Sequence, residues 1–115
     1  MTLFEVLLVA HFVGDYLFQT SWMAMNKAKN WAALLVHSAV YTLVLYVAAN
    51  LIWAKQPLSW PALAVIFFGH VILDRRTFVA WWVRKIMMAP ESSWLSIMAD
   101  QIFHFLLIAW AIYLS

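Results

Sequence analysis

Four long apolar runs separated by short polar connections constrain this chain more than any other feature. The runs cover approximately Leu3–Met23, Trp31–Trp53, Pro61–Val83 and Trp94–Leu114. Each has about 20 residues, the length at which an α-helix crosses the hydrocarbon layer of a bilayer. Because the connections are short, consecutive helices should run antiparallel. We therefore predict an all-α membrane protein with a single domain over residues 1–115, built as a bundle of four transmembrane helices.

The composition also favours a lipid environment. Hydrophobic residues make up 67% of the 115 residues and charged residues only 10%, against about 45–50% and about 25% in soluble domains. Most tryptophans flank the predicted connections, where amphipathic rings favour the membrane–water interface. The absence of cysteine excludes disulfides, thiolate metal sites and iron–sulfur clusters. A net charge of +2 does not favour nucleic-acid binding.

Basic residues predict the orientation in the membrane. The first and third connections carry Lys27, Lys29, Arg84 and Lys85, whereas the second carries Lys55 alone. By the positive-inside rule, the first and third connections face the cytoplasm and both termini face outward. We expect a multi-pass protein of the bacterial inner membrane, in contact with membrane lipid.

Histidines and aspartates follow a regular pattern within the apolar runs. Each predicted helix carries one histidine, and every aspartate lies four residues from a histidine, a spacing that places both on one helix face. The pairs are His11/Asp15, His70/Asp74 and Asp100/His104, with His37/Tyr41 at the same spacing. An ionised side chain within the bilayer costs at least about 2.5–3.5 kcal/mol. The aspartates therefore need partners, and we predict one shared cavity in the cytoplasmic half.

The two halves of the chain show a weak internal repeat. The first half reads HxxxD, a basic connection and HxxxY, and the second reads HxxxD, a basic connection and DxxxH. Two repeated helical hairpins would bring both motif pairs together. Such a cradle could hold one or two metal ions.

We interpret the cluster as a metal site. Imidazole and carboxylate ligands suit Zn²⁺, Mn²⁺ or Fe²⁺ better than Mg²⁺ or Cu⁺. The predicted ligands are His11, Asp15, His37, His70, Asp74, Asp100 and His104. Asp15 or Asp74 would act as general base and Tyr41 as proton donor. Gln19 would support a ligand by a hydrogen bond. For Gln101 two roles are open: packing between helices, or a hydrogen bond that supports a ligand.

Other interpretations compete with a metal site. The His–Asp pairs could serve only to hold the helices together. Bis-histidine haem is less favoured, because it leaves the aspartates unexplained and two glycines leave little space for a porphyrin. Lys27, Arg75 and Arg76 would bind an anionic group, with anchoring of the topology as the alternative.

The motifs resemble those of a family of small bacterial and phage integral membrane proteins of unknown function. The stretches that carry the resemblance are HFVGDYLFQTSWMAMNKAKN, HSAVY, HVILDRR and DQIFH. They follow the pattern HxxxDxxxQ…K, HxxxY, HxxxDxxK and DQxxH. The chain departs from it after Asp74, where Arg75, Arg76 and Thr77 replace the expected basic pattern. The HxxxD arrangement is more loosely similar to that of membrane-bound metal-dependent hydrolases.

These observations predict a metal-dependent hydrolase. The metal would activate water for attack on an ester or phosphoester, with an anionic lipid or a nucleotide as substrate. A metal-ion or proton transporter is the alternative, although the outer half offers little polarity beyond Glu5 and Asn50. A third interpretation is a non-catalytic helper that the metal only stabilises. Because four helices enclose little volume, the sequence also allows a homodimer.

Overall fold

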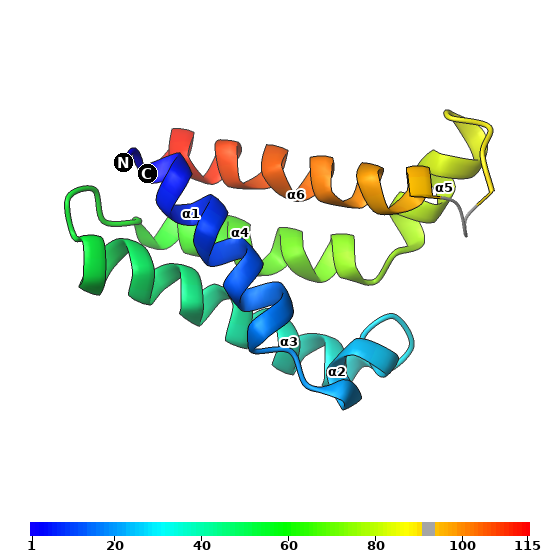
Figure 1. The fold of residues 1–115 in the computed structure, drawn as a ribbon, viewed down its shortest axis with the longest axis horizontal. Coiled ribbons are helices and arrows are strands. Elements are labelled where there is room, and N and C mark those ends of the chain that lie inside the picture. Colours follow the sequence, from blue (N-terminus) through cyan, green and yellow to red (C-terminus); the bar gives the residue numbers. More distant parts are fainter. Residues whose placement is uncertain (91–93) are drawn as a thin grey trace.

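The computed structural model describes residues 1–90 and 94–115, and within these residues the secondary structure is helical, with no strand (Figure 1). The all-helical class expected from the sequence is therefore confirmed. In chain order the elements are α1 (Leu3–Phe12), the π-helical segment η1 (Val13–Leu17), α2 (Ser21–Asn26), α3 (Trp31–Tyr46), the π-helical segment η2 (Val47–Trp53), α4 (Trp60–Asp74), α5 (Thr77–Lys85) and α6 (Trp94–Leu114).

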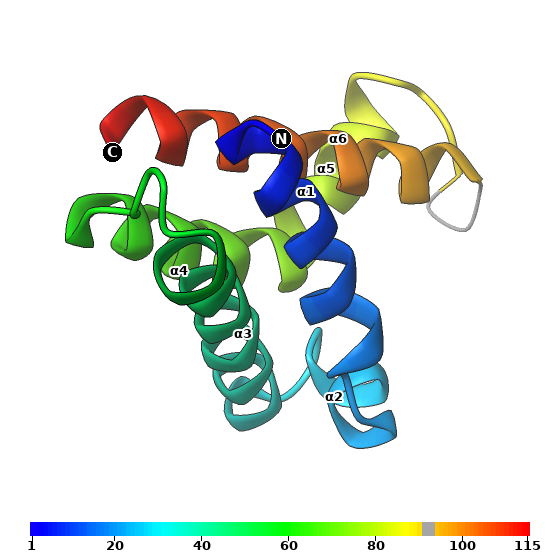
Figure 2. The same ribbon diagram turned by 60° about the vertical axis from the view of Figure 1, so that its left-hand side comes forward.

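Helices α1, α3, α4 and α6 contact one another in sequence. Helices α1 and α4 each contact both α3 and α6, which closes a ring of neighbours. The two termini lie at one end of the molecule, whereas α2 and α5 lie at the other (Figures 1 and 2). The connection between η2 and α4 lies at the same end as the termini, where the Ser59 N–H donates to Ser115 Oγ at 3.1 Å.

Two helical runs are long and apolar enough to cross a membrane. These runs, Trp31–Trp53 with 23 residues and Trp94–Leu114 with 21, have the bounds that hydropathy predicts. Helix α4 is apolar but shorter, with 15 residues. Two candidate spans are weaker support than four, and the four-span bundle stays a prediction.

The first and third predicted helices are each interrupted. The first leaves the helix at Phe18, and α2 then starts anew with the Thr20 side chain as its N-cap. The third breaks at Arg76, which adopts a left-handed conformation with φ of 68° between α4 and α5. The Arg76 guanidinium donates to Ser96 Oγ at 3.0 Å. Hydropathy does not register such a tertiary contact, so it predicts one helix across the apolar residues on both sides.

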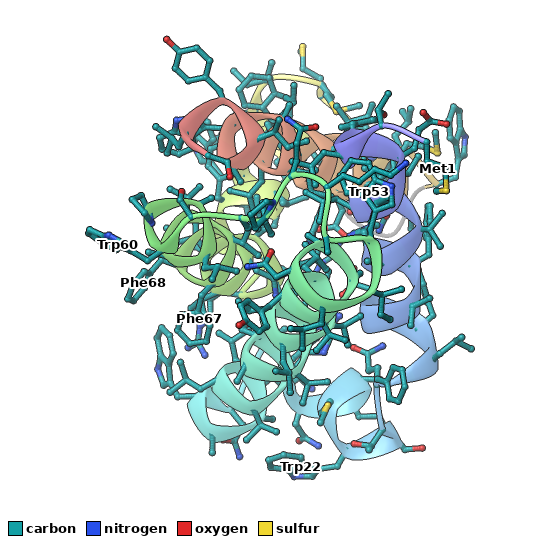
Figure 3. The ribbon with its side chains drawn as sticks, turned by 90° about the vertical axis from the view of Figure 1, so that its left-hand side faces the viewer. Met1, Trp22, Trp53, Trp60, Phe67 and Phe68 are labelled. Atoms are coloured by element: carbon teal, nitrogen blue, oxygen red, sulfur yellow. The ribbon has the colours of Figure 1, made fainter. Side chains whose placement is uncertain are left out.

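The interior has an apolar part and a part with buried polar side chains, whereas the outer faces expose large apolar side chains. The interior at the terminal end is apolar and contains Leu7, Leu45, Ile66 and Ile108, all fully buried. All four histidines are also fully buried. Large apolar side chains are meanwhile exposed on the outer faces; Trp60 and Phe68, for example, project away from the helices (Figure 3).

Candidate metal centre

Two aspartates and two histidines from three helical segments meet in the interior. Asp15 comes from η1, His37 from α3, and His70 and Asp74 from the C-terminal end of α4. His37 Nε2 lies 3.1 Å from Asp15 Oδ1 and 2.9 Å from Asp74 Oδ2. His70 Nε2 lies 3.2 Å and 3.5 Å from the same two oxygens. We call these four side chains the first donor set.

The spacing of the first donor set fits a transition-metal ion. Its nitrogens and oxygens alternate around a ring with sides of 2.9–3.5 Å, and all four atoms lie within 4.8 Å of one another. The centre of a regular tetrahedron with edges of about 3.2 Å lies about 2.0 Å from each corner, and flattening it to a square lengthens this to about 2.3 Å. Zinc binds histidine nitrogen and carboxylate oxygen at about 2.0–2.2 Å. The residues present therefore suit such an ion.

A second group lies next to the first and shares Asp74 with it. Asp74, Asp100 and His104 offer ligand atoms that also lie within 4.8 Å of one another. His104 Nε2 is 3.2 Å from Asp74 Oδ1, and His104 Nδ1 is 2.7 Å from the Asp100 backbone carbonyl. Oδ2 of Asp74 thus faces the histidines of the first donor set, and Oδ1 of the same carboxylate faces His104.

His11 lies beside the cluster but has other partners. Its Nε2 is 2.9 Å from Gln101 Oε1 and its Nδ1 is 2.7 Å from the Tyr41 hydroxyl. An amide oxygen only accepts, so Nε2 carries the proton and Tyr41 donates to Nδ1. The nearest Asp15 oxygen is 3.7 Å away. A ligand role for His11 stays a prediction.

Several neighbours hold the histidines in place. The Tyr41 ring stacks on His70 with a centroid distance of 3.9 Å, so one tyrosine orients two histidines. The Ser38 hydroxyl lies 3.2 Å from His70 Nδ1, a contact that sequence reasoning missed. The only signal for it is that a small polar residue adjoins His37. Gln101 makes the supporting contact that we predicted as the alternative to packing.

The local backbone brings these groups together. Asp15 lies in a five-residue π-helical segment, and such segments are rare and frequent at functional sites. Gly14 lets this segment approach α3, since an added Cβ would lie 3.2 Å from Tyr41 Cδ2. Asp74 is the last residue of α4. A helix C-terminus carries partial negative charge, which favours a cation there.

A polar cleft of about 250 Å³ opens beside the cluster at the end of the molecule that carries α2. Its lining includes Lys27, Arg76, Gln19 and Gln101, together with Asp15, Tyr16, Ile97 and Asp100. Lys27 Nζ lies 3.1 Å from Asp74 Oδ2. The structure does not bring Arg75 into this cleft, because its guanidinium lies 4.2 Å from the centre of the Trp31 ring and lines a different cavity.

A family model described as a protein of unknown function (DUF3307) matches residues 3–115. The chain belongs to this family. Neither the curated proteins nor the solved structures gave a match. Membership of DUF3307 supports the resemblance to an uncharacterised family and assigns no chemistry. The function of this DUF3307 chain must therefore be inferred from its buried His–Asp cluster.

Proposed function

We propose that this chain is an integral membrane protein that binds a divalent transition metal, Zn²⁺, Mn²⁺ or Fe²⁺, and hydrolyses an anionic ester or phosphoester. The metal ligands are Asp15, His37, His70 and Asp74. The observation that carries the proposal is the ring of four buried donor atoms spaced 2.9–3.5 Å apart. When bound, the metal polarises the scissile bond and lowers the pKa of water.

Electrostatics favour a cation at the centre over a purely hydrogen-bonded cluster. Asp15 and Asp74 are only 5% and 3% exposed, and their facing oxygens lie within 4.8 Å. At that separation and an effective dielectric constant of 20, two carboxylates repel by about 3.5 kcal/mol. Each imidazole has one Nε2 proton and faces both oxygens, so it can donate to only one at a time. Lys27 Nζ, 3.1 Å from Asp74 Oδ2, offsets part of this repulsion, whereas a divalent ion at the centre neutralises both carboxylates at once.

Lipid is the solvent that suits the outer surface. Exposed side chains such as Val9, Leu43, Phe68 and Leu106 would form an apolar belt around buried histidines and aspartates. Helix α4 has 15 residues, so it is about 22 Å long, shorter than a hydrocarbon layer of about 30 Å. It ends at the metal ligand Asp74, as η1 ends just after Asp15. The site is then open to the end that carries the basic residues, which the positive-inside rule assigns to the cytoplasm.

The cleft favours a small anionic group as the reacting part of the substrate. Lys27 and Arg76 supply positive charge, which the lining carboxylates Asp15 and Asp100 balance until a metal binds them. Gln19 and Gln101 supply hydrogen bonds. Sites that enclose a whole small molecule measure about 300–1,000 Å³, whereas this cleft holds about 250 Å³. We therefore favour a phosphate-bearing lipid whose acyl chains stay in the bilayer over a nucleotide. Proton-transfer roles for Asp15, Asp74 and Tyr41 stay predictions, and the Tyr41 hydroxyl already serves His11.

Conduction through the membrane is the weaker proposal. A conducting path needs polar groups or water along its whole length. On the terminal side of the cluster the interior is filled by Leu7, Leu45, Ile66 and Ile108, all fully buried. This apolar layer closes the site on one side and supports a site entered from the other.

The test is to purify the full chain in mild detergent and count metals by elemental mass spectrometry. We expect at least one equivalent in the wild type and in Asn50→Ala, a control at the opposite end. His37→Ala and Asp74→Ala should each hold at least one equivalent fewer than the wild type. A wild type without metal after zinc, manganese and iron supplementation would refute the metal site. Bound metal without hydrolysis of any phospholipid, phosphomonoester or carboxylic ester would refute the hydrolase.

A further inference from the structure

We infer that the site holds a second divalent metal ion, bound by Asp74, Asp100 and His104 and joined to the first through the Asp74 carboxylate. The inference rests on the proposed function, because it requires an ion at the first donor set. It adds a two-metal mechanism, in which paired ions about 3.5–4 Å apart stabilise the attacking and leaving oxygens of a phosphoester.

The contacts of His104 carry the inference. Its Nδ1 lies 2.7 Å from the Asp100 backbone carbonyl, which only accepts, so Nδ1 carries a proton. Nε2 faces Asp74 Oδ1 at 3.2 Å, and in the neutral imidazole its lone pair can bind a cation placed between the two atoms. Among the described residues Nε2 has no hydrogen-bond partner, although His104 is fully buried.

Asp74 has the geometry of a bridging carboxylate. Its Oδ2 belongs to the first donor set, 2.9 Å from His37 Nε2, and its Oδ1 faces His104. Metal-ligating histidines almost always donate their other N–H to a carbonyl or carboxylate, as His104 does here. Asp100 supplies the third ligand, since its Oδ1 is buried without a hydrogen-bond partner within the part of the chain that the structure describes and lies 3.7 Å from His104 Nδ1.

One ligand of the second group lies where a substrate would bind. Asp100 lines the polar cleft beside Lys27 and Arg76, as Asp15 of the first donor set also does, whereas His104 is fully buried. Three protein ligands leave coordination positions for water or a phosphate oxygen, as catalytic metal sites require. An ion here would reach the cleft on the side of Asp100.

Charge indicates when the second ion binds. The three aspartates with Lys27 and Arg76 carry a net charge of −1, which one divalent ion changes to +1. A second ion raises it to +3, and a phosphate dianion offsets most of this excess. The second ion should therefore bind most tightly with phosphate present. A proton on His104 Nε2 would satisfy the same contact with Asp74, and the count of metal ions distinguishes the two.

The experiment is equilibrium dialysis of the purified full chain against Mn²⁺ with inorganic phosphate, followed by metal counting and electron paramagnetic resonance. The wild type and Asn50→Ala should hold two equivalents and give the spectrum of a magnetically coupled pair. His104→Gln and the nearly isosteric Asp100→Asn should each hold one, with an uncoupled six-line spectrum.

The outcomes separate this inference from the function on which it rests. One uncoupled equivalent in the wild type, lost in His37→Ala and kept in His104→Gln and Asp100→Asn, would overturn the second site and leave the first intact. No manganese in the wild type would overturn both. If one variant does not fold, the other still decides the count.

Discussion

Replacing Asp15 by asparagine separates a metal site from a cluster that only holds helices together. Asparagine is nearly isosteric with aspartate, and Asp15 Oδ1 lies 3.1 Å from His37 Nε2 and 3.2 Å from His70 Nε2. The substitution removes one negative charge and one metal ligand and leaves the packing almost unchanged. Its effect on stability should therefore depend on whether metal is present.

The expected change in the free energy of unfolding is worked out separately with metal and without metal. A metal at 1,000 times its dissociation constant stabilises the folded state by about 4.1 kcal/mol, and Asp15→Asn should forfeit most of this. Without metal, the variant loses charge-assisted hydrogen bonds worth about 3 kcal/mol. It also loses the repulsion from Asp74, which amounts to about 3.5 kcal/mol at a separation within 4.8 Å. These terms nearly offset, so the metal-free difference should be about 1 kcal/mol or less.

Thermal unfolding in detergent, with zinc or with a chelator, measures this difference. At about 4 °C per kcal/mol, Asp15→Asn should lower the midpoint by roughly 15 °C in zinc and by only a few degrees in the chelator. Asn50→Ala is the matched control, because Asn50 bonds the backbone of Leu58 far from the site and should cost the same in both conditions. An equal loss for Asp15→Asn in zinc and in chelator would refute the metal site.

Three further predictions test the surroundings of the site. Tyr41→Phe keeps the ring stacked on its histidine neighbour but loses a buried 2.7 Å hydrogen bond, so it should destabilise the fold by about 1–3 kcal/mol and leave the metal count unchanged. The chain has no cysteine, so in intact cells an impermeant maleimide should label Lys55→Cys and not Lys29→Cys; equal labelling would refute the orientation. Gly69→Ala places a Cβ 2.3 Å from Leu107 Cδ1, so it should lower the unfolding midpoint in detergent, and Leu107→Ala should restore it.

Much of the site could be predicted because it depends on helical periodicity alone. His70 and Asp74 occupy one face of α4 at a spacing of four, and both reach the first donor set. Hydropathy likewise places the ends of the two long helical runs, since their interiors are uniformly apolar. Local repeats of this kind need no knowledge of which helices are neighbours.

The different contacts of the histidines could not be predicted, because they depend on which distant segments of the chain are neighbours. His11 and His70 each have an aspartate four residues later, yet only His70 lies within 3.5 Å of two carboxylates. What distinguishes His11 is Gln101, which lies 90 residues away in the chain. Spacing also places Arg75 and Arg76 together, whereas the left-handed conformation at Arg76 sends their side chains to different cavities.

The interruptions of the helices bear on whether a metal here would be structural or catalytic. A helix that ends leaves its last carbonyl groups without intrahelical partners, and in lipid each unsatisfied group costs several kcal/mol. Helix α4 ends at Asp74, about 22 Å from its start, which is inside the thickness of a bilayer if its first residue lies at the opposite surface. Irregular backbone at that depth is tolerated only where it is covered by protein or lines a water-filled cavity. The polar cleft beside Lys27 and Asp100 is such a place. The end of α4 that carries Asp74 would therefore lie beside a cavity that can hold water, the second reactant in the proposed hydrolysis.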